Sequence, residues 1–142
     1  MAFAMPGSPK IRLKGLLRLI AAGSFLFTGT LHFLDPEMFQ RIVPPRLPAP
    51  AALVAISGIC EIAGGIGLLI LPLRRWAGVG LIALLIAVFP ANIYMALAPD
   101  KPPASHFPHW ALWGRLPFQG ILILWVWWVA LAHQNEQSAT AV

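Results

Sequence analysis

Four apolar runs, each long enough to cross a bilayer, constrain the fold of this chain more than any other feature. They lie at about 15–33, 51–71, 76–97 and 112–132. A helix that crosses the hydrocarbon core needs about 20 mainly apolar residues. Only 11% of the 142 residues are charged, whereas a soluble domain carries about 25%. The sequence therefore predicts an all-α membrane protein, a four-transmembrane-helix antiparallel bundle.

The connections predict how the four runs are joined. Asp35 can cap a helix that begins at Pro36, which suits a first helical position. We expect this short helix to lie at the membrane interface between spans one and two, and Pro44 and Pro45 to end it. Pro72 precedes a pair of arginines in a very short turn, so spans two and three form a hairpin.

The domain organisation follows from these boundaries. Residues 1–10 are expected to be a disordered N-terminus, residues 11–133 the four-helix domain, and residues 134–142 a disordered tail. The connection at 98–110 is rich in proline and is expected to be a loop without a regular helix.

Basic residues flank the apolar runs and do not form one continuous face. This distribution indicates orientation in an anionic membrane rather than binding to nucleic acid. The basic residues on the side of the N-terminus are Lys10, Arg12, Lys14, Arg18, Arg74 and Arg75. The other side has Arg41, Arg46, Lys101 and Arg115. The first set is larger and lies in shorter segments, which predicts that both termini lie in the cytoplasm.

Glu61 lies near the middle of the second apolar run. An ionisable group at that depth costs about 2.5–3.5 kcal/mol by insertion scales, so it needs a partner or a purpose. Its neighbours one helical turn away are small: Ser57, Gly58, Gly64 and Gly65. Small residues let another helix approach closely, so the carboxylate is expected to face the inside of the bundle.

Each of the four runs contributes a polar group to the outer half of the bundle. The candidates for a ligand-binding polar pocket are His32, Glu61, Asn92, Arg115 and Gln119. We expect Glu61 to pair with Arg115 or Gln119, or else to carry a proton because burial disfavours its charge. Phe89 and Trp113 are the candidate walls of the pocket. No catalytic residue is assigned by this pattern.

Metal and thiol chemistry have little support in the sequence. Cys60 is the single cysteine, so neither a disulfide within one chain nor a CxxC pair can form. His106 and His109 lie in a loop without a third ligand nearby. We therefore predict no metal site.

An ordered set of short motifs resembles the DoxX-like family of small bacterial membrane proteins. The motifs are His32-Phe33 with Pro36, Ile42-Val43-Pro44-Pro45 with Leu47-Pro48, Ser57-Gly58 with Glu61 and Gly64-Gly65, Phe89-Pro90-Ala91-Asn92, and Arg115-Leu116-Pro117-Phe118-Gln119. The resemblance implies a four-helix bundle in the inner membrane. The wider family includes a subunit of a thiosulfate:quinone oxidoreductase and the methylamine-utilisation protein MauE. It therefore implies a redox-associated role with a membrane or redox partner subunit, and a quinone as the possible cofactor.

Three functions remain open from the sequence. The first is a redox-associated, quinone-linked subunit or a binder of a small apolar ligand, whose polar pocket faces the outer half of the bundle. The second is a membrane scaffold or assembly factor without chemistry. The third is a small transporter or proton path. The sequence supports it less, because it has one deep acidic residue and no obvious internal repeat.

Overall fold

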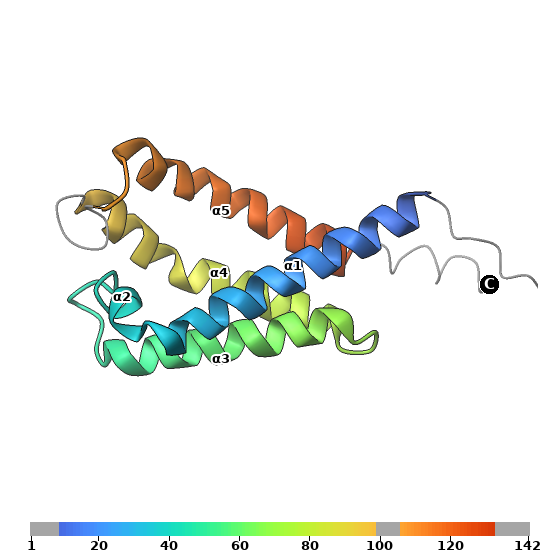
Figure 1. The fold of residues 1–142 in the computed structure, drawn as a ribbon, viewed down its shortest axis with the longest axis horizontal. Coiled ribbons are helices and arrows are strands. Elements are labelled where there is room, and N and C mark those ends of the chain that lie inside the picture. The colour runs from blue at the N-terminus through green and yellow to red at the C-terminus, as the bar shows by residue number, and fades with distance from the viewer. Residues whose placement is uncertain (1–8, 99–105, 133–142) are drawn as a thin grey trace, which may run out of the picture.

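A computed structural model describes residues 9–98 and 106–132, and within those two ranges the chain is helical and contains no strand. The helices are α1 (Pro9–Leu34), α2 (Pro36–Gln40), α3 (Pro50–Leu69), α4 (Arg74–Leu97) and α5 (His109–Ala130). The four long helices alternate in direction, so α1 begins at the end where α5 stops (Figure 1). We call this the core end, and we call the opposite end, where α2 lies, the α2 end.

Three of the helices are long and apolar enough to cross a membrane. The corresponding segments are Leu13–Leu34, Pro50–Leu69 and Arg74–Leu97. Many of their large apolar side chains are exposed, such as Phe27 at 66% and Ile59 at 58%. An apolar surface of this extent indicates contact with the lipid bilayer. The chain is therefore a helical membrane protein.

Helix α5 has the length of a span but a lower mean hydropathy than these three helices. Its 22 residues include five tryptophans together with Arg115 and Gln119. Tryptophan has an indole N–H and favours the membrane interface, so it adds little to the mean hydropathy. The difference from the other three helices thus reflects which residues α5 contains and not its length.

The buried core joins all four long helices toward the core end. It contains Ala21, Ala22 and Phe25 from α1, Leu68 from α3, Leu81 from α4, and Val126 and Ala130 from α5. Toward the α2 end, α4 and α5 draw away from α1 and α3 (Figure 1). A second, smaller core of Met95, Ala96 and Leu112 lies between α4 and α5 there, and Ile42, just after α2, packs against it. The molecule thus has one core shared by the four long helices and a smaller one at the α2 end.

Some boundaries agree with the sequence prediction and others differ from it. The Asp35 cap is confirmed, because its Oδ1 accepts a hydrogen bond from the Met38 N–H at 3.3 Å and Pro36 begins α2. Residues 9 and 10, expected to be disordered, belong to α1. Helix α5 begins at His109, inside the expected loop. Pro108 precedes it in an extended conformation, and the carbonyl oxygen of Pro108 accepts a hydrogen bond from the Ala111 N–H. The predictions for residues 1–8, 99–105 and 133–142 lie outside the described residues.

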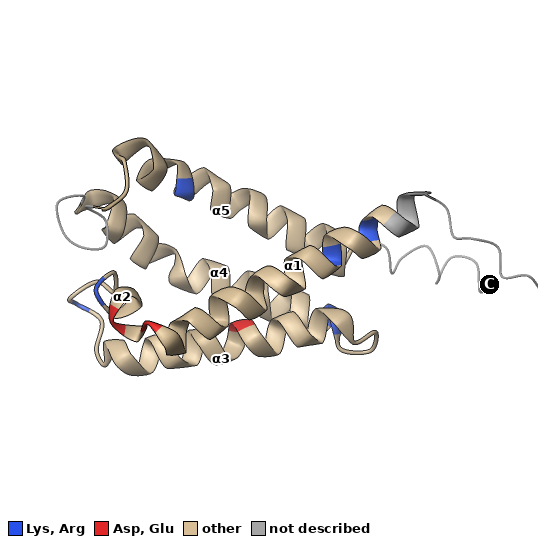
Figure 2. Ribbon diagram, viewed as in Figure 1, with Lys and Arg blue, Asp and Glu red and all other residues tan. Residues whose placement is uncertain are grey.

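Basic residues lie at both ends of the molecule, whereas the described acidic residues do not reach the core end. The basic residues at the core end lie on α1 and at the α3–α4 turn, whereas the described acidic residues lie from the middle of α3 toward α2 (Figure 2). Among the described residues, the acidic side chains are Asp35, Glu37 and Glu61. Glu37 pairs with Arg41 one turn later on the surface, at 3.3 Å. Of these three acidic residues, Glu61 is the one that lies inside an apolar helix of membrane length.

Candidate functional site

Glu61 meets two polar side chains of α1. The Thr28 hydroxyl donates to Glu61 Oε2, and His32 Nε2 lies 4.0 Å from Glu61 Oε1. The side chains of His32 and Glu61 are only 9% and 14% exposed. We call Thr28, His32 and Glu61 the Glu61 cluster. It places a carboxylate, a hydroxyl and an imidazole together within two membrane-length helices.

The imidazole of His32 is held in a fixed orientation. Its Nδ1 lies 2.8 Å from the backbone carbonyl of Thr28. A carbonyl can only accept, so Nδ1 carries the proton and Nε2 faces the carboxylate. Phe39 of α2 stacks on the ring, with centroids 3.9 Å apart and planes inclined by 20°. The short helix α2 therefore positions a ring whose open nitrogen points toward Glu61.

The Thr28 hydroxyl can serve Glu61 in either protonation state. When Glu61 is ionised, the hydroxyl donates to it. When Glu61 carries a proton, the carboxyl group can donate to the Thr28 oxygen, while the hydroxyl donates to the carbonyl of Ser24 at 3.0 Å. The bond between Thr28 and Glu61 can therefore persist in both protonation states of the carboxyl group.

Two glycines bring α1 and α3 close enough to form the Glu61 cluster. A Cβ atom at Gly29 would lie 2.9 Å from the carbonyl oxygen of Gly58 and 3.0 Å from Glu61 Cβ. A Cβ atom at Gly58 would lie 2.8 Å from His32 Cβ. Small residues at a helix crossing permit such close backbone approach. Gly58 was expected to do this, but Gly29 was missed, although its position next to Thr28 on α1 was visible in the sequence.

A second polar cluster joins α4 to α5. Asn92 Nδ2 donates to Gln119 Oε1 at 2.7 Å, and Gln119 Nε2 donates to the carbonyl of Leu85. Arg115 donates to Asn92 Oδ1 at 3.4 Å and to the sulfur of Met95 at 3.4 Å. We call Asn92, Arg115 and Gln119 the Gln119 cluster. Both the oxygen and the nitrogen of the buried Gln119 side-chain amide are bonded within the protein, so this cluster helps to hold α4 against α5.

The structure thus divides the five predicted polar residues into two groups. His32 and Glu61 come together, and Asn92, Arg115 and Gln119 come together. The expected pairing of Glu61 with Arg115 or Gln119 is not the one found, because glycine packing places Glu61 against α1. Of the candidate walls, Phe89 is half-buried on α4, whereas Trp113 is 52% exposed on α5.

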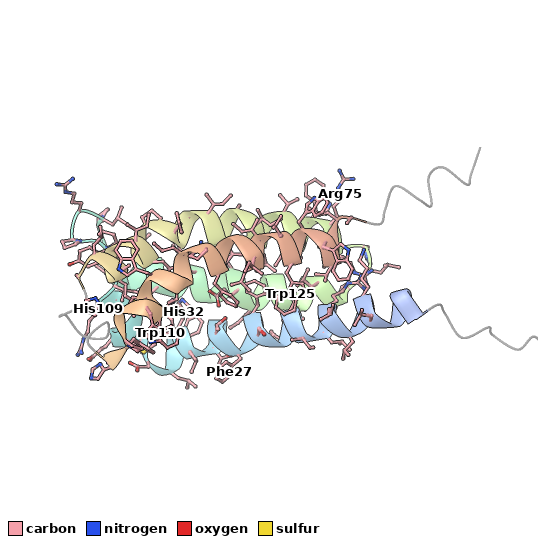
Figure 3. All side chains as sticks on the ribbon, turned by 90° about the horizontal axis from the view of Figure 1, so that it is seen from above. Phe27, His32, Arg75, His109, Trp110 and Trp125 are labelled. Atoms are coloured by element: carbon pink, nitrogen blue, oxygen red, sulfur yellow. The ribbon has the colours of Figure 1, made fainter. Side chains whose placement is uncertain are left out.

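Trp125 adds a polar group that the sequence analysis did not single out. Its indole Nε1 is buried and has no hydrogen-bond partner, and no other side-chain nitrogen or oxygen among the described residues shares this property. Its ring packs against the four-helix core. Figure 3 shows His32 toward the α2 end and Trp125 farther along the helices toward the core end. A buried unpaired N–H is rare in proteins and calls for an explanation such as an unseen acceptor.

Two other features bear on the chemistry of the site. Within residues 9–98 and 106–132, no group of three His, Cys, Asp or Glu side chains is placed to hold a metal ion. Cys60, next to Glu61 in sequence, is exposed and carries a free thiol. The carboxylate, hydroxyl and imidazole of the Glu61 cluster can take part in hydrogen bonding and proton exchange.

Fold and site together define a helical membrane protein with a hydrogen-bonded carboxylate between two apolar helices. Residues 21–130, most of the chain, match the family described as Domain of unknown function (DUF8561), and the chain belongs to this family. Comparison with curated proteins and with solved structures gives no match.

Proposed function

We propose that this protein spans a bacterial inner membrane four times and binds a small apolar ligand with carbonyl oxygens, such as a quinone, at the Glu61 cluster. In this proposal α5 is the fourth span, α2 lies at the interface, and both termini are cytoplasmic. The observation that carries the proposal is the hydrogen-bonded carboxylate of Glu61 beside an imidazole held in one orientation. An ionisable group within a membrane helix is usually retained for a function.

The residues of the chain fit a quinone. Thr28, His32 and Glu61 form a group that can offer or accept a proton. A quinone supplies two-electron, two-proton redox chemistry when bound. The role of the Glu61 cluster is to bind and orient the ligand and to exchange protons with it. The electrons would come from a partner subunit, in keeping with the resemblance to the DoxX-like family.

The test measures binding of a short-chain ubiquinone analogue to the protein in mild detergent. Thr28→Val removes the hydroxyl that bonds Glu61, and Thr30→Val is its matched control, because Thr30 bonds only its own helix, to the carbonyl of Leu26. We expect binding to weaken at least about tenfold in Thr28→Val and Glu61→Gln, the equivalent of one lost hydrogen bond to a charged group. Thr30→Val should bind like the wild type. Equal binding by all variants would refute the ligand site.

A scaffold function is favoured by a different observation, the close packing through glycine. A side chain at Gly64 would collide with Leu81 of α4. If the protein acts only by holding partners together, Glu61→Gln will retain function in the cell and Gly64→Leu will abolish it. If the Glu61 cluster binds a ligand, Glu61→Gln will lose function while the folded protein still accumulates in the membrane.

A further inference from the structure

Two arginines at the core end are anchored on the ends of neighbouring helices. Arg18 Nε donates to the carbonyl of Val129 at 3.0 Å, and Arg74 Nε donates to the carbonyl of Leu68 at 3.2 Å. Val129 and Leu68 lie in the last turns of α5 and α3, where carbonyls have no partner within the helix. A cation at a helix C-terminus is also favoured by the helix dipole. Both guanidinium groups are therefore fixed in place by Nε.

This anchoring leaves the outer nitrogens of both guanidinium groups available. Among the described residues, the Nη atoms of Arg18 and Arg74 have no hydrogen-bond partner. The two anchoring carbonyls lie at the same end of the bundle, because Leu68 and Ala130, the neighbour of Val129, pack in one core. Lys14, one turn before Arg18, is buried with its ammonium 5.6 Å from the centre of the Trp128 ring. The described part of the chain has no carboxylate at this end, since its acidic residues lie toward α2.

We propose that Arg18 and Arg74 bind the phosphate of an anionic phospholipid. A guanidinium group presents a planar pair of donors that matches phosphate oxygens. The surroundings favour a lipid over a phosphate ion from solution. Helices α1 and α4, which carry the two arginines, also expose Leu19 (59%) and Trp76 (75%). Acyl chains would therefore find apolar contacts beside the headgroup. This lipid site is separate from the Glu61 cluster and does not depend on the proposed ligand.

Native mass spectrometry of the detergent-purified full chain tests the site directly. The protein is titrated with phosphatidylglycerol and with phosphatidylcholine of the same acyl chains. We expect the wild type to retain phosphatidylglycerol preferentially. Arg18→Gln and Arg74→Gln should each weaken that binding about fivefold, as expected for one basic residue near a lipid surface. Arg75→Gln is the matched control, because Arg75 is exposed at the same end and its substitution removes the same charge.

Three results would overturn the proposal. Equal weakening by Arg75→Gln would mean that overall charge attracts the lipid and that no site exists. Inorganic phosphate that binds as well as the lipid, measured by thermal stabilisation in phosphatidylcholine nanodiscs, would identify a site for a soluble anion. Unchanged lipid preference in the two variants would exclude the arginines. Should Arg18→Gln not fold, Arg74→Lys carries the test, because it keeps the charge but loses the paired donors, and it too should bind the lipid more weakly.

Discussion

Replacement of Gly29 by alanine is expected to force α1 and α3 apart at the Glu61 cluster. The new methyl group would lie 2.8 Å from Ile62 Cγ1, 2.9 Å from the Gly58 carbonyl oxygen and 3.0 Å from Glu61 Cβ. Ile62 can turn aside, but the Gly58 carbonyl belongs to the backbone and can move only with α3. Inserting a methyl group into a packed interior typically costs about 1–3 kcal/mol.

Gly23→Ala is the matched control for this prediction. Gly23 lies on the same helix, and a Cβ atom there would meet nothing within 4 Å. Both substitutions gain the same helix propensity, up to about 1 kcal/mol, so this contribution cancels when the two variants are compared. The difference between them should be about 1–3 kcal/mol in the free energy of unfolding, or roughly 5- to 150-fold in the folding equilibrium.

The assay is unfolding by sodium dodecyl sulfate from mild detergent micelles, followed by circular dichroism. Infrared spectroscopy of the Glu61 carboxyl band, identified with Glu61→Gln, reports on the same crossing. We expect Gly29→Ala to unfold at lower detergent fraction and to shift the carboxyl band, since Thr28 can no longer reach Glu61. Gly23→Ala should do neither. If the two variants unfold alike and leave the band unchanged, the close approach of α1 and α3 is refuted.

Two further predictions concern the other polar contacts. Gln119→Leu deprives Asn92 and the carbonyl of Leu85 of a partner and should cost about 0.6–1.7 kcal/mol, the range for hydrogen bonds between membrane helices. The double variant with Asn92→Leu should cost less than the sum of the single changes in the same unfolding assay, and strict additivity would contradict the contact. Phe39→Leu removes the ring stacked on His32 and should cost about 0.5–1.5 kcal/mol. It should also speed the reaction of His32 with diethyl pyrocarbonate, mapped by peptide mass, whereas Phe27→Leu on the exposed face should leave that rate unchanged.

The helices were predictable from the sequence because apolar length and proline position act locally. The Asp35 cap and the start of α2 at Pro36 depend on neighbours three residues away. The hydroxyl groups of Ser24 and Thr28 likewise bond to carbonyls of their own helix, as hydroxyl side chains in membrane helices commonly do. Such features need no knowledge of which helix lies beside which.

The partners of Glu61 were not predictable in the same way. Its position on α3 could be read from the sequence, but its neighbour depends on which helix α3 meets most closely. Gly29 and Gly58 decide this by bringing α1 nearer than α4 at that level. The Arg18 cap on α5 was missed for the same reason, because Arg18 reaches a carbonyl 111 residues away in the sequence. Contacts between helices depend on rotation and distance, which a single sequence does not specify.

The exposed thiol of Cys60 makes the depth of Glu61 measurable in the unmodified protein. The sequence contains one cysteine, so a spin label attached there occupies a single position and needs no background substitutions. Adjacent residues on a helix differ by about 1.5 Å along its axis. The accessibility of the label to oxygen and to a water-soluble quencher therefore gives the immersion depth of the carboxylate nearly directly. A label found in water would place α3 outside the bilayer.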